Sequence, residues 1–145
     1  ITTTPESRMT DQTDEEIVKA YRALSLRKGL KNLEAMGLGE NKYLKDVDPE
    51  FWAFTVENLF GNVFSREALS LRDRELITLS VLVALNRMHG IPTHFRAAPA
   101  VGISDDQVRE LIIHVMHYAG WPCGAQAMAN FNTFVAEGRG KALFG

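Results

Sequence analysis

Residues 70–102 read SLRDRELITLSVLVALNRMHGIPTHFRAAPAVG, and this stretch decides the fold. Ser70 and Asp73 are typical of a helix start, because their side chains can cap the first turn. The apolar residues that follow, as far as Leu85, cover nearly every side of the predicted helix. A helix that is apolar all round belongs in the interior of a domain. We therefore expect it to form the spine of the core.

A second helix is predicted directly after this spine. Pro92 is well placed in a first helical turn, and Gly102 is a typical residue just past a helix end. Pro99 falls inside the segment and should kink or shorten it. With a turn at residues 86–91 between them, the two helices could form an antiparallel hairpin.

Each of these two helices carries an ionisable residue on an apolar face. Glu75 is in register with Leu79 and Leu82, and His94 follows it by nineteen positions on the second helix. An ionisable group on an apolar face is costly unless it is paired, so Glu75 and His94 are the best candidates for chemistry. In such a pair Glu75 would orient the imidazole, and His94 would act as a general acid or base.

The same two residues also have a structural interpretation. A glutamate near the start of a helix often forms a local salt bridge, here with Arg72 or Arg74. A single histidine on an apolar face is usually a hydrogen-bonded core residue. The pattern by itself leaves both interpretations open.

Helix starts and stops recur along the rest of the chain, whereas strand alternation does not. Gly37, Gly61 and Gly120 mark three of the expected helix ends. The first helix should be amphipathic, with its Lys and Arg side chains outside. The sequence thus predicts an all-α fold of about six helices, the other four at residues 13–36, 49–60, 104–118 and 122–135.

The composition is that of one ordinary globular domain, with 145 residues of which 46% are hydrophobic and 23% charged. We expect a single domain over residues 1–145, with residues 1–12 as a flexible polar tail. The formal net charge is −2 and the basic residues are scattered, so nucleic acid is not an expected partner.

The chain has one cysteine, Cys123, and no apolar run as long as a membrane span. A lone cysteine leaves neither an intramolecular disulfide nor a CxxC pair, which suits a reducing compartment. We therefore expect a cytoplasmic protein with no membrane partner.

Several motifs occur in an order that resembles a known family. On these motifs, residues 62–137 are similar to the carboxymuconolactone decarboxylase family, which includes the AhpD-like alkylhydroperoxidases. The motifs are LRDRELITL (71–79), LVAL (82–85), HFRAA (94–98), Gly102 followed by residues 104–110, and YAGWP (118–122).

The resemblance implies a small all-α, AhpD-like fold that assembles as trimers or hexamers. It also implies active sites in pockets near subunit contacts, with no organic cofactor and no metal. Glu75 and His94 match positions that this family uses to handle protons, which strengthens the catalytic interpretation of the pair.

Two departures from the family pattern narrow the chemistry. The peroxidase branch has a CxxC at positions that are Arg87 and Gly90 here, so disulfide-cycle peroxide reduction is excluded. The decarboxylase branch commonly has an acidic residue at the position of Gly90, and its absence counts against the standard decarboxylation. His89 could substitute for that acid, although a histidine in a turn is more often solvated.

Other side chains are weaker candidates for substrate binding. Arg96 could bind a substrate carboxylate, contact a neighbouring subunit or be solvated. His117 and Trp121 flank or lie within the YAGWP motif and could line a pocket. Trp52, within a group of phenylalanines, could belong to the core, to an interface or to a pocket wall. His114 and His117 have a metal-chelating spacing but lack a third ligand, so no metal site is predicted.

These observations favour a cofactor-independent proton-transfer enzyme. Its most favoured reaction is decarboxylation or isomerisation of a small carboxylated lactone or oxo-acid. One alternative is a natural-product biosynthetic enzyme, a cyclase, isomerase or decarboxylase, acting on a larger polyketide-like substrate. Another is a non-catalytic oligomeric binding protein in which Glu75 and His94 form a structural ion pair.

Overall fold

The computed structural model of the chain describes residues 13–139, so the tail predicted at residues 1–12 lies outside the described residues. Within the described part there are helices and no strands, which confirms the all-α prediction. The elements are α1 (Asp14–Ala35), α2 (Lys42–Val47), α3 (Pro49–Thr55), the π-helix η2 (Val56–Val63), α4 (Leu71–Ala84), α5 (Ile91–Ala100), α6 (Asp105–Ala119) and α7 (Trp121–Ala136).

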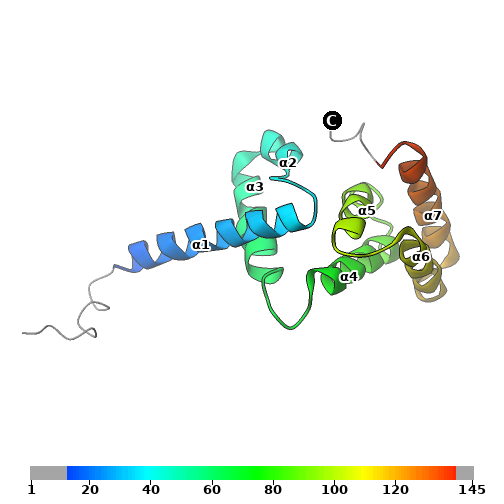
Figure 1. Ribbon diagram of the computed structural model, residues 1–145, viewed down its shortest axis with the longest axis horizontal. Coiled ribbons are helices and arrows are strands. Elements are labelled where there is room, and N and C mark those ends of the chain that lie inside the picture. The colour runs from blue at the N-terminus through cyan, green and yellow to red at the C-terminus, as the bar shows by residue number, and fades with distance from the viewer. Residues whose placement is uncertain (1–12, 140–145) are drawn as a thin grey trace, which may run out of the picture.

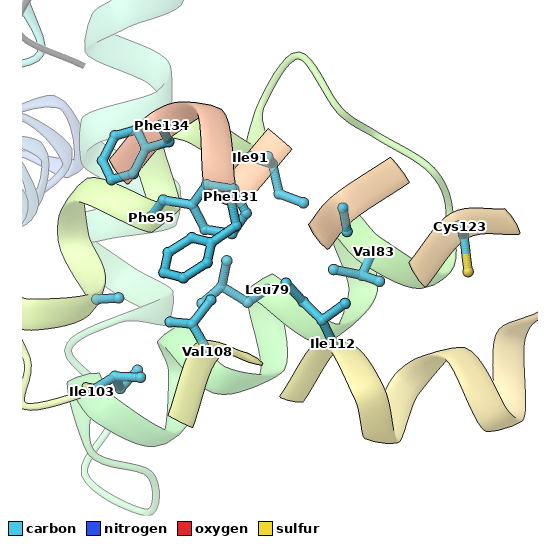
Figure 2. Close-up of a cluster of buried hydrophobic side chains, with 12 residues drawn as sticks. Leu79, Val83, Ile91, Phe95, Ile103, Val108, Ile112, Cys123, Phe131 and Phe134 are labelled. Carbon is cyan, nitrogen blue, oxygen red and sulfur yellow. The ribbon is translucent and has the colours of Figure 1, made fainter. Parts of the chain in front are cut away.

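The helices form two groups along the long axis of the molecule (Figure 1). Helices α1, α2, α3 and η2 make up one group, and α4 to α7 make up the other. Each group has its own set of buried apolar side chains. The N-terminal cluster consists of Leu33, Met36, Val56, Phe60, Phe64 and Ala97. The C-terminal cluster (Figure 2) consists of Leu79, Val83, Ile91, Phe95, Ala98, Ile103, Val108, Ile112, Cys123, Ala127, Phe131 and Phe134.

Two glycines allow α1 and η2 to cross at very short range. A Cβ atom built on Gly29 would lie 2.2 Å from the Val56 carbonyl oxygen, and one on Gly61 would lie 2.1 Å from the Ser25 carbonyl oxygen. Real Cβ atoms do not approach backbone that closely, so only glycine fits at either position. The close approach is what allows the long helix α1 to pack on η2.

The helix predicted at residues 49–60 does not end at Gly61. It runs from Pro49 through α3 and continues as η2 to Val63, so the predicted end was wrong. A glycine ends a helix when it adopts a left-handed conformation, as Gly37 does with φ 69° after α1. Gly61 is instead buried inside η2, where it serves the crossing with α1.

The sequence also left out one short helix, α2. Its first turn is capped by Asn41, which has a left-handed φ of 52° and accepts a hydrogen bond from the Leu44 amide. The described residues therefore form seven α-helices, one more than the approximate prediction of six.

The first half of α1 is not packed as predicted. Its apolar side chains were expected to face the core, yet Ile17, Val18, Tyr21 and Leu24 are between 45% and 59% exposed. The reason is that α1 first contacts η2 through the side-chain hydrogen bonds of Tyr21 to Asn62 and of Arg22 to Glu57, and the buried residues of α1 begin only at Ser25. The first turns of α1 therefore project beyond the crossing (Figure 1).

Helix α4 begins as the sequence predicts. The Ser70 hydroxyl accepts a hydrogen bond from the Asp73 amide, and the Asp73 carboxylate accepts one from the Ser70 amide. The Ser70 hydroxyl also donates to this carboxylate, and these hydrogen bonds, with the nearby Arg72 charge, hold the pKa of Asp73 below its ordinary value. This capping box fixes the first turn of α4, from which Glu75 projects one turn later.

A left-handed Asn86, with φ 54°, ends α4 and turns the chain back. The Arg87 amide then donates to the Leu82 carbonyl, and α5 starts at Ile91 with Pro92 in its first turn. Pro99 lies in the last turn of α5, where the helix continues for only one more residue. The predicted hairpin of two helices is thus confirmed.

No helix in the described residues is both long and apolar enough to span a membrane.

The crossing of α1 and η2 makes a stability prediction. Gly61→Ala should lower the free energy of unfolding by roughly 1–3 kcal/mol, because the new methyl group overlaps the Ser25 carbonyl. Gly90→Ala is the matched control, since its Cβ atom would meet nothing closer than 3.8 Å. Urea denaturation followed by circular dichroism measures both. Equal midpoints for the two variants would show that the crossing is not tight.

Candidate active site

Glu75 is fully buried where the two clusters meet. Leu71, one turn before it on α4, packs against the N-terminal cluster, and Leu79, one turn after it, belongs to the C-terminal cluster. The side chain of Glu75 has no exposed surface. A carboxylate in such a place requires a partner to offset the loss of its hydration.

His94 supplies that partner from α5. Its Nδ1 atom lies 2.8 Å from Oε1 of Glu75. When Glu75 is ionised its oxygens can only accept hydrogen bonds, so in that state Nδ1 carries the proton of this pair. The imidazole side chain is 18% exposed, and Nε2 lies on the ring edge that points away from Glu75. The geometry is that of a histidine oriented by a buried acid, with a minor part of its side chain exposed.

The second oxygen of Glu75 has no hydrogen-bond partner among the described residues. Oε2 is buried and accepts no hydrogen bond, although a buried carboxylate oxygen is costly to leave unpaired. Sequence reasoning missed this feature, since no residue pattern signals which oxygen of a carboxylate is satisfied.

The arginines that could have paired with Glu75 locally are used elsewhere. Arg72 donates from Nε to the Gly102 carbonyl at 3.4 Å, and Arg74 donates from Nη2 to the Arg66 carbonyl at 3.0 Å. Both therefore tie α4 to neighbouring loops. The local salt bridge considered from the sequence is wrong, and the pairing with His94 across the hairpin takes its place.

His89 and Arg96 lie on either side of His94 along the chain. His89 is exposed in the turn before α5, five positions before His94. Arg96 is half-buried on α5, but two residues correspond to about 200° around a helix, so it points away from the face that carries His94. Their substrate-binding roles stay predictions.

Trp52 is held by the N-terminal helices. Its Nε1 donates to the Glu40 carbonyl at 2.6 Å, and the Lys45 ammonium lies over its ring, 4.7 Å from the centroid. The predicted aromatic group around it divides, since Phe60 and Phe64 are buried while Phe51 and Phe54 are 55% and 63% exposed. Trp52 thus covers the edge of the N-terminal cluster.

His117 and Trp121 lie at the junction of α6 and α7. The two rings make an edge-on contact with centroids 6.1 Å apart, and Nδ1 of His117 donates to the Ile113 carbonyl. Phe131 on α7 makes an edge-on contact with Phe95, which follows His94 (Figure 2). Trp121 precedes Phe131 by ten residues, or about 15 Å of helix, and the substrate-binding roles of Trp121 and His117 stay predictions.

His114 makes a ring contact with Tyr118 rather than with His117. Across residues 13–139, no three His, Cys, Asp or Glu side chains gather closely enough to hold a metal ion. Cys123 is buried in the C-terminal cluster and its thiol donates to the Gly120 carbonyl.

Comparison with known proteins identifies the family to which the chain belongs. The sequence profile of the carboxymuconolactone decarboxylase family matches residues 49–132. The chain belongs to this family. The matched segment includes Trp52 as well as the Glu75–His94 hairpin, and so begins earlier than the motifs at residues 62–137 indicated.

Two curated relatives of this family member are named as decarboxylases. The chain is 38% identical over 85 residues to a 4-carboxymuconolactone decarboxylase of Acinetobacter baylyi, covering 59% of this chain and 63% of that protein. It is 29% identical over 69 residues to a nitrosuccinic acid decarboxylase of Metarhizium robertsii, covering 48% of each chain. The chain therefore spans between about half and two thirds of the length of these relatives.

Gly90, which stands where a family acid or the second cysteine is expected, has an ordinary helical backbone with φ −80° and ψ −21°. A Cβ atom there would have no neighbour within 3.8 Å. The backbone at this position therefore does not require glycine, and the absence of a side chain leaves space one turn before His94.

The hydrogen bond between Glu75 and His94 predicts that the effects of the two residues on stability are coupled. His94→Ala should destabilise the protein by roughly 1–3 kcal/mol, because the buried Glu75 carboxylate loses the one donor that it has among the described residues. The double variant Glu75→Leu/His94→Ala should recover part of that loss, since no buried charge remains. Urea denaturation at pH 7 gives the coupling free energy of the cycle. Strictly additive effects would show that the hydrogen bond does not stabilise the fold.

Proposed function

We propose that this protein is a decarboxylase that acts on a small carboxylated lactone or oxo-acid, with Glu75 and His94 as its proton-handling groups and without an organic cofactor. The observation that carries the proposal is the 2.8 Å hydrogen bond from His94 Nδ1 to a fully buried carboxylate. Such a bond fixes the tautomer and orientation of the imidazole, as a general acid or base requires.

The names of the two relatives support a common electronic requirement. The first name describes a molecule that has both a carboxylic acid and a lactone. The second describes a molecule that has both carboxylic acids and a nitro group. A lactone carbonyl and a nitro group can each receive the electron pair that remains when carbon dioxide leaves a nearby carbon. We propose the same requirement for the substrate of this protein.

In the proposed reaction the bond between the substrate carbon and its carboxylate breaks, and its electron pair delocalises into the adjacent carbonyl to give an enolate. His94 in its imidazolium form then donates the Nε2 proton to that carbon, and the electron pair returns to form the new C–H bond. The neutral imidazole keeps its Nδ1 proton, which stays hydrogen-bonded to Glu75, and solvent then reprotonates Nε2. The Glu75 charge stabilises the imidazolium throughout.

A larger polyketide-like substrate is the second candidate, and the observation that favours it is Gly90. No atom lies closer than 3.8 Å to a Cβ atom built on Gly90, so the space that a family acid would fill is open and a bulkier ring system could occupy it. The reaction would use the same proton donor, which leaves substrate size as the distinguishing property. Soaking crystals with carboxylated lactones and with aromatic polyketides separates the two candidates.

The catalytic role of His94 can be tested by substitution. His94→Gln keeps the size and a hydrogen-bonding group but cannot carry a transferable proton, so kcat should fall by about 10²–10⁴. Release of carbon dioxide from carboxylated lactones is the measurement, with circular dichroism to verify folding. His114→Gln is the matched control, because His114 is exposed on α6 and contacts Tyr118. Unchanged turnover in a folded His94→Gln protein would contradict the proposal, and lost turnover with retained ligand binding would rule out a protein that only binds.

We further propose that the protein works as a cytoplasmic homo-oligomer, a trimer or a hexamer as the family resemblance implies. Exposed apolar and aromatic side chains support an assembly, among them Phe51, Phe54, Leu85, Tyr118 and Trp121, each at least 55% exposed. Large apolar patches on a surface are typical of subunit interfaces.

The assembly is open to direct measurement. Light scattering at micromolar concentration should give a mass at least three times that of the chain, 16.2 kDa. The exposed apolar side chains would then be covered by other copies. A well-folded monomer would contradict the oligomeric proposal while leaving the proposed chemistry to be judged by the His94 variant.

A further inference from the structure

The first half of α1 is a helix without a neighbour on most of its surface. Residues 13–24 are all exposed, although α1 is fully helical from Asp14. Short helices in water depend on packing for most of their stability. This capped helical arm, residues 13–24, carries apolar side chains, so we expect it to pack against another surface.

The exposed side chains of this arm form a single seam. It follows a heptad spacing, with apolar residues in the middle and charged residues at the ends. In chain order the seam is Asp14, Ile17, Tyr21, Leu24, Lys28 and Lys31, at alternating intervals of three and four, and all six are exposed.

The seam does not compete with the crossing of α1 and η2. Ser25 and Gly29, which contact η2, each come one residue after a member of the seam. One residue corresponds to about 100° around a helix, so the seam lies beside the η2 contact. The two meet at Tyr21, whose hydroxyl donates to Asn62 Oδ1 of η2 at 3.3 Å. Tyr21 is still 59% exposed with η2 in place, so its ring stays accessible to a partner helix.

We propose that the occupant of the seam is the α1 helix of a second copy of this chain, packed antiparallel about a two-fold axis. With the axis between Tyr21 and Leu24, Tyr21 of each copy lies opposite Leu24 of the other. One step outward, Ile17 lies opposite the aliphatic stem of Lys28. At each end Asp14 lies opposite Lys31, so unlike charges meet twice.

Charge is the argument for this occupant. The N-terminal turn of α1 carries Asp14, Glu15 and Glu16, and its last two seam positions are Lys28 and Lys31. A parallel pair would place like charges together at both ends of the seam, whereas the antiparallel pair places opposite charges together. The surface is thus complementary to itself, as an interface with two-fold symmetry requires.

This pairing deepens the oligomeric proposal above by fixing one symmetry element. A two-fold axis requires an even number of subunits, so it is compatible with a hexamer built from two trimers and not with an isolated trimer.

The test uses two neighbouring substitutions. Leu24→Asp places a charge in the middle of the seam, twice per interface, and should halve the mass of the assembly measured by light scattering. Ala23→Asp is the matched control, because Ala23 is also exposed but lies about 100° away from the seam. It should leave the mass unchanged. A Leu24→Asp protein with the parent mass would overturn the proposal, and so would a parent protein that is a trimer or a monomer.

A charge exchange decides the question even if Leu24→Asp disturbs folding. Asp14→Lys and Lys31→Asp should each raise the dissociation constant of the two-fold contact by about tenfold, since like charges then meet at both ends. The double variant should restore the parent value. Single variants with the parent affinity, or a double variant that is weaker than both, would overturn the pairing. A parent trimer would leave the proposed oligomer intact and refute only the α1 contact.

Discussion

The buried carboxylate of Glu75 is the constraint on which the centre of the molecule depends. A charge without exposed surface is tolerated in a protein interior only when another group pairs with it. Here that group is His94, which reaches Glu75 because a left-handed Asn86 ends α4 and returns the chain as α5. The capping box of α4 sets one side of this geometry and the Asn86 turn sets the other. Local backbone chemistry thus places two ionisable groups together inside a core.

The second constraint is the contact between α1 and η2, which brings the N-terminal helices to the same place. Gly29 and Gly61 allow the two backbones to touch, and the N-terminal cluster that results includes Ala97, three residues after His94 on α5. His94 is therefore flanked by Ala97 in one cluster and Ala98 in the other. The N-terminal helices form part of the surroundings of the histidine, so the tightness of a distant helix crossing bears on the site.

The sequence predicts local features of this fold well and packing features poorly. The caps at Ser70 and the stop at Gly37 were predicted because they depend on hydrogen bonds within a few residues. Gly61 and Gly37 are both glycines, but Gly61 is required by the close approach of another helix and Gly37 by a helix end. No local sequence pattern separates the two cases. Likewise, the apolar spacing of α1 predicts an apolar face but does not predict what covers that face. Glu75 and His94 were found as a pair because charge on an apolar face is a local signal, whereas the unpaired oxygen of Glu75 is visible only in three dimensions.

The spacing of Trp121 and Phe131 along α7 bears on how a substrate could be bound. Phe131 lies against Phe95 beside His94, and Trp121 lies about 15 Å further along the same helix. If Trp121 and His117 help to bind a small substrate that receives a proton from His94, this spacing favours a contribution from another copy over one from the same chain. In that arrangement another chain would bring its α6–α7 junction to the exposed edge of the imidazole. Assembly would then complete the pocket, and the apolar side chains exposed on a single chain would cover both the interface and the substrate.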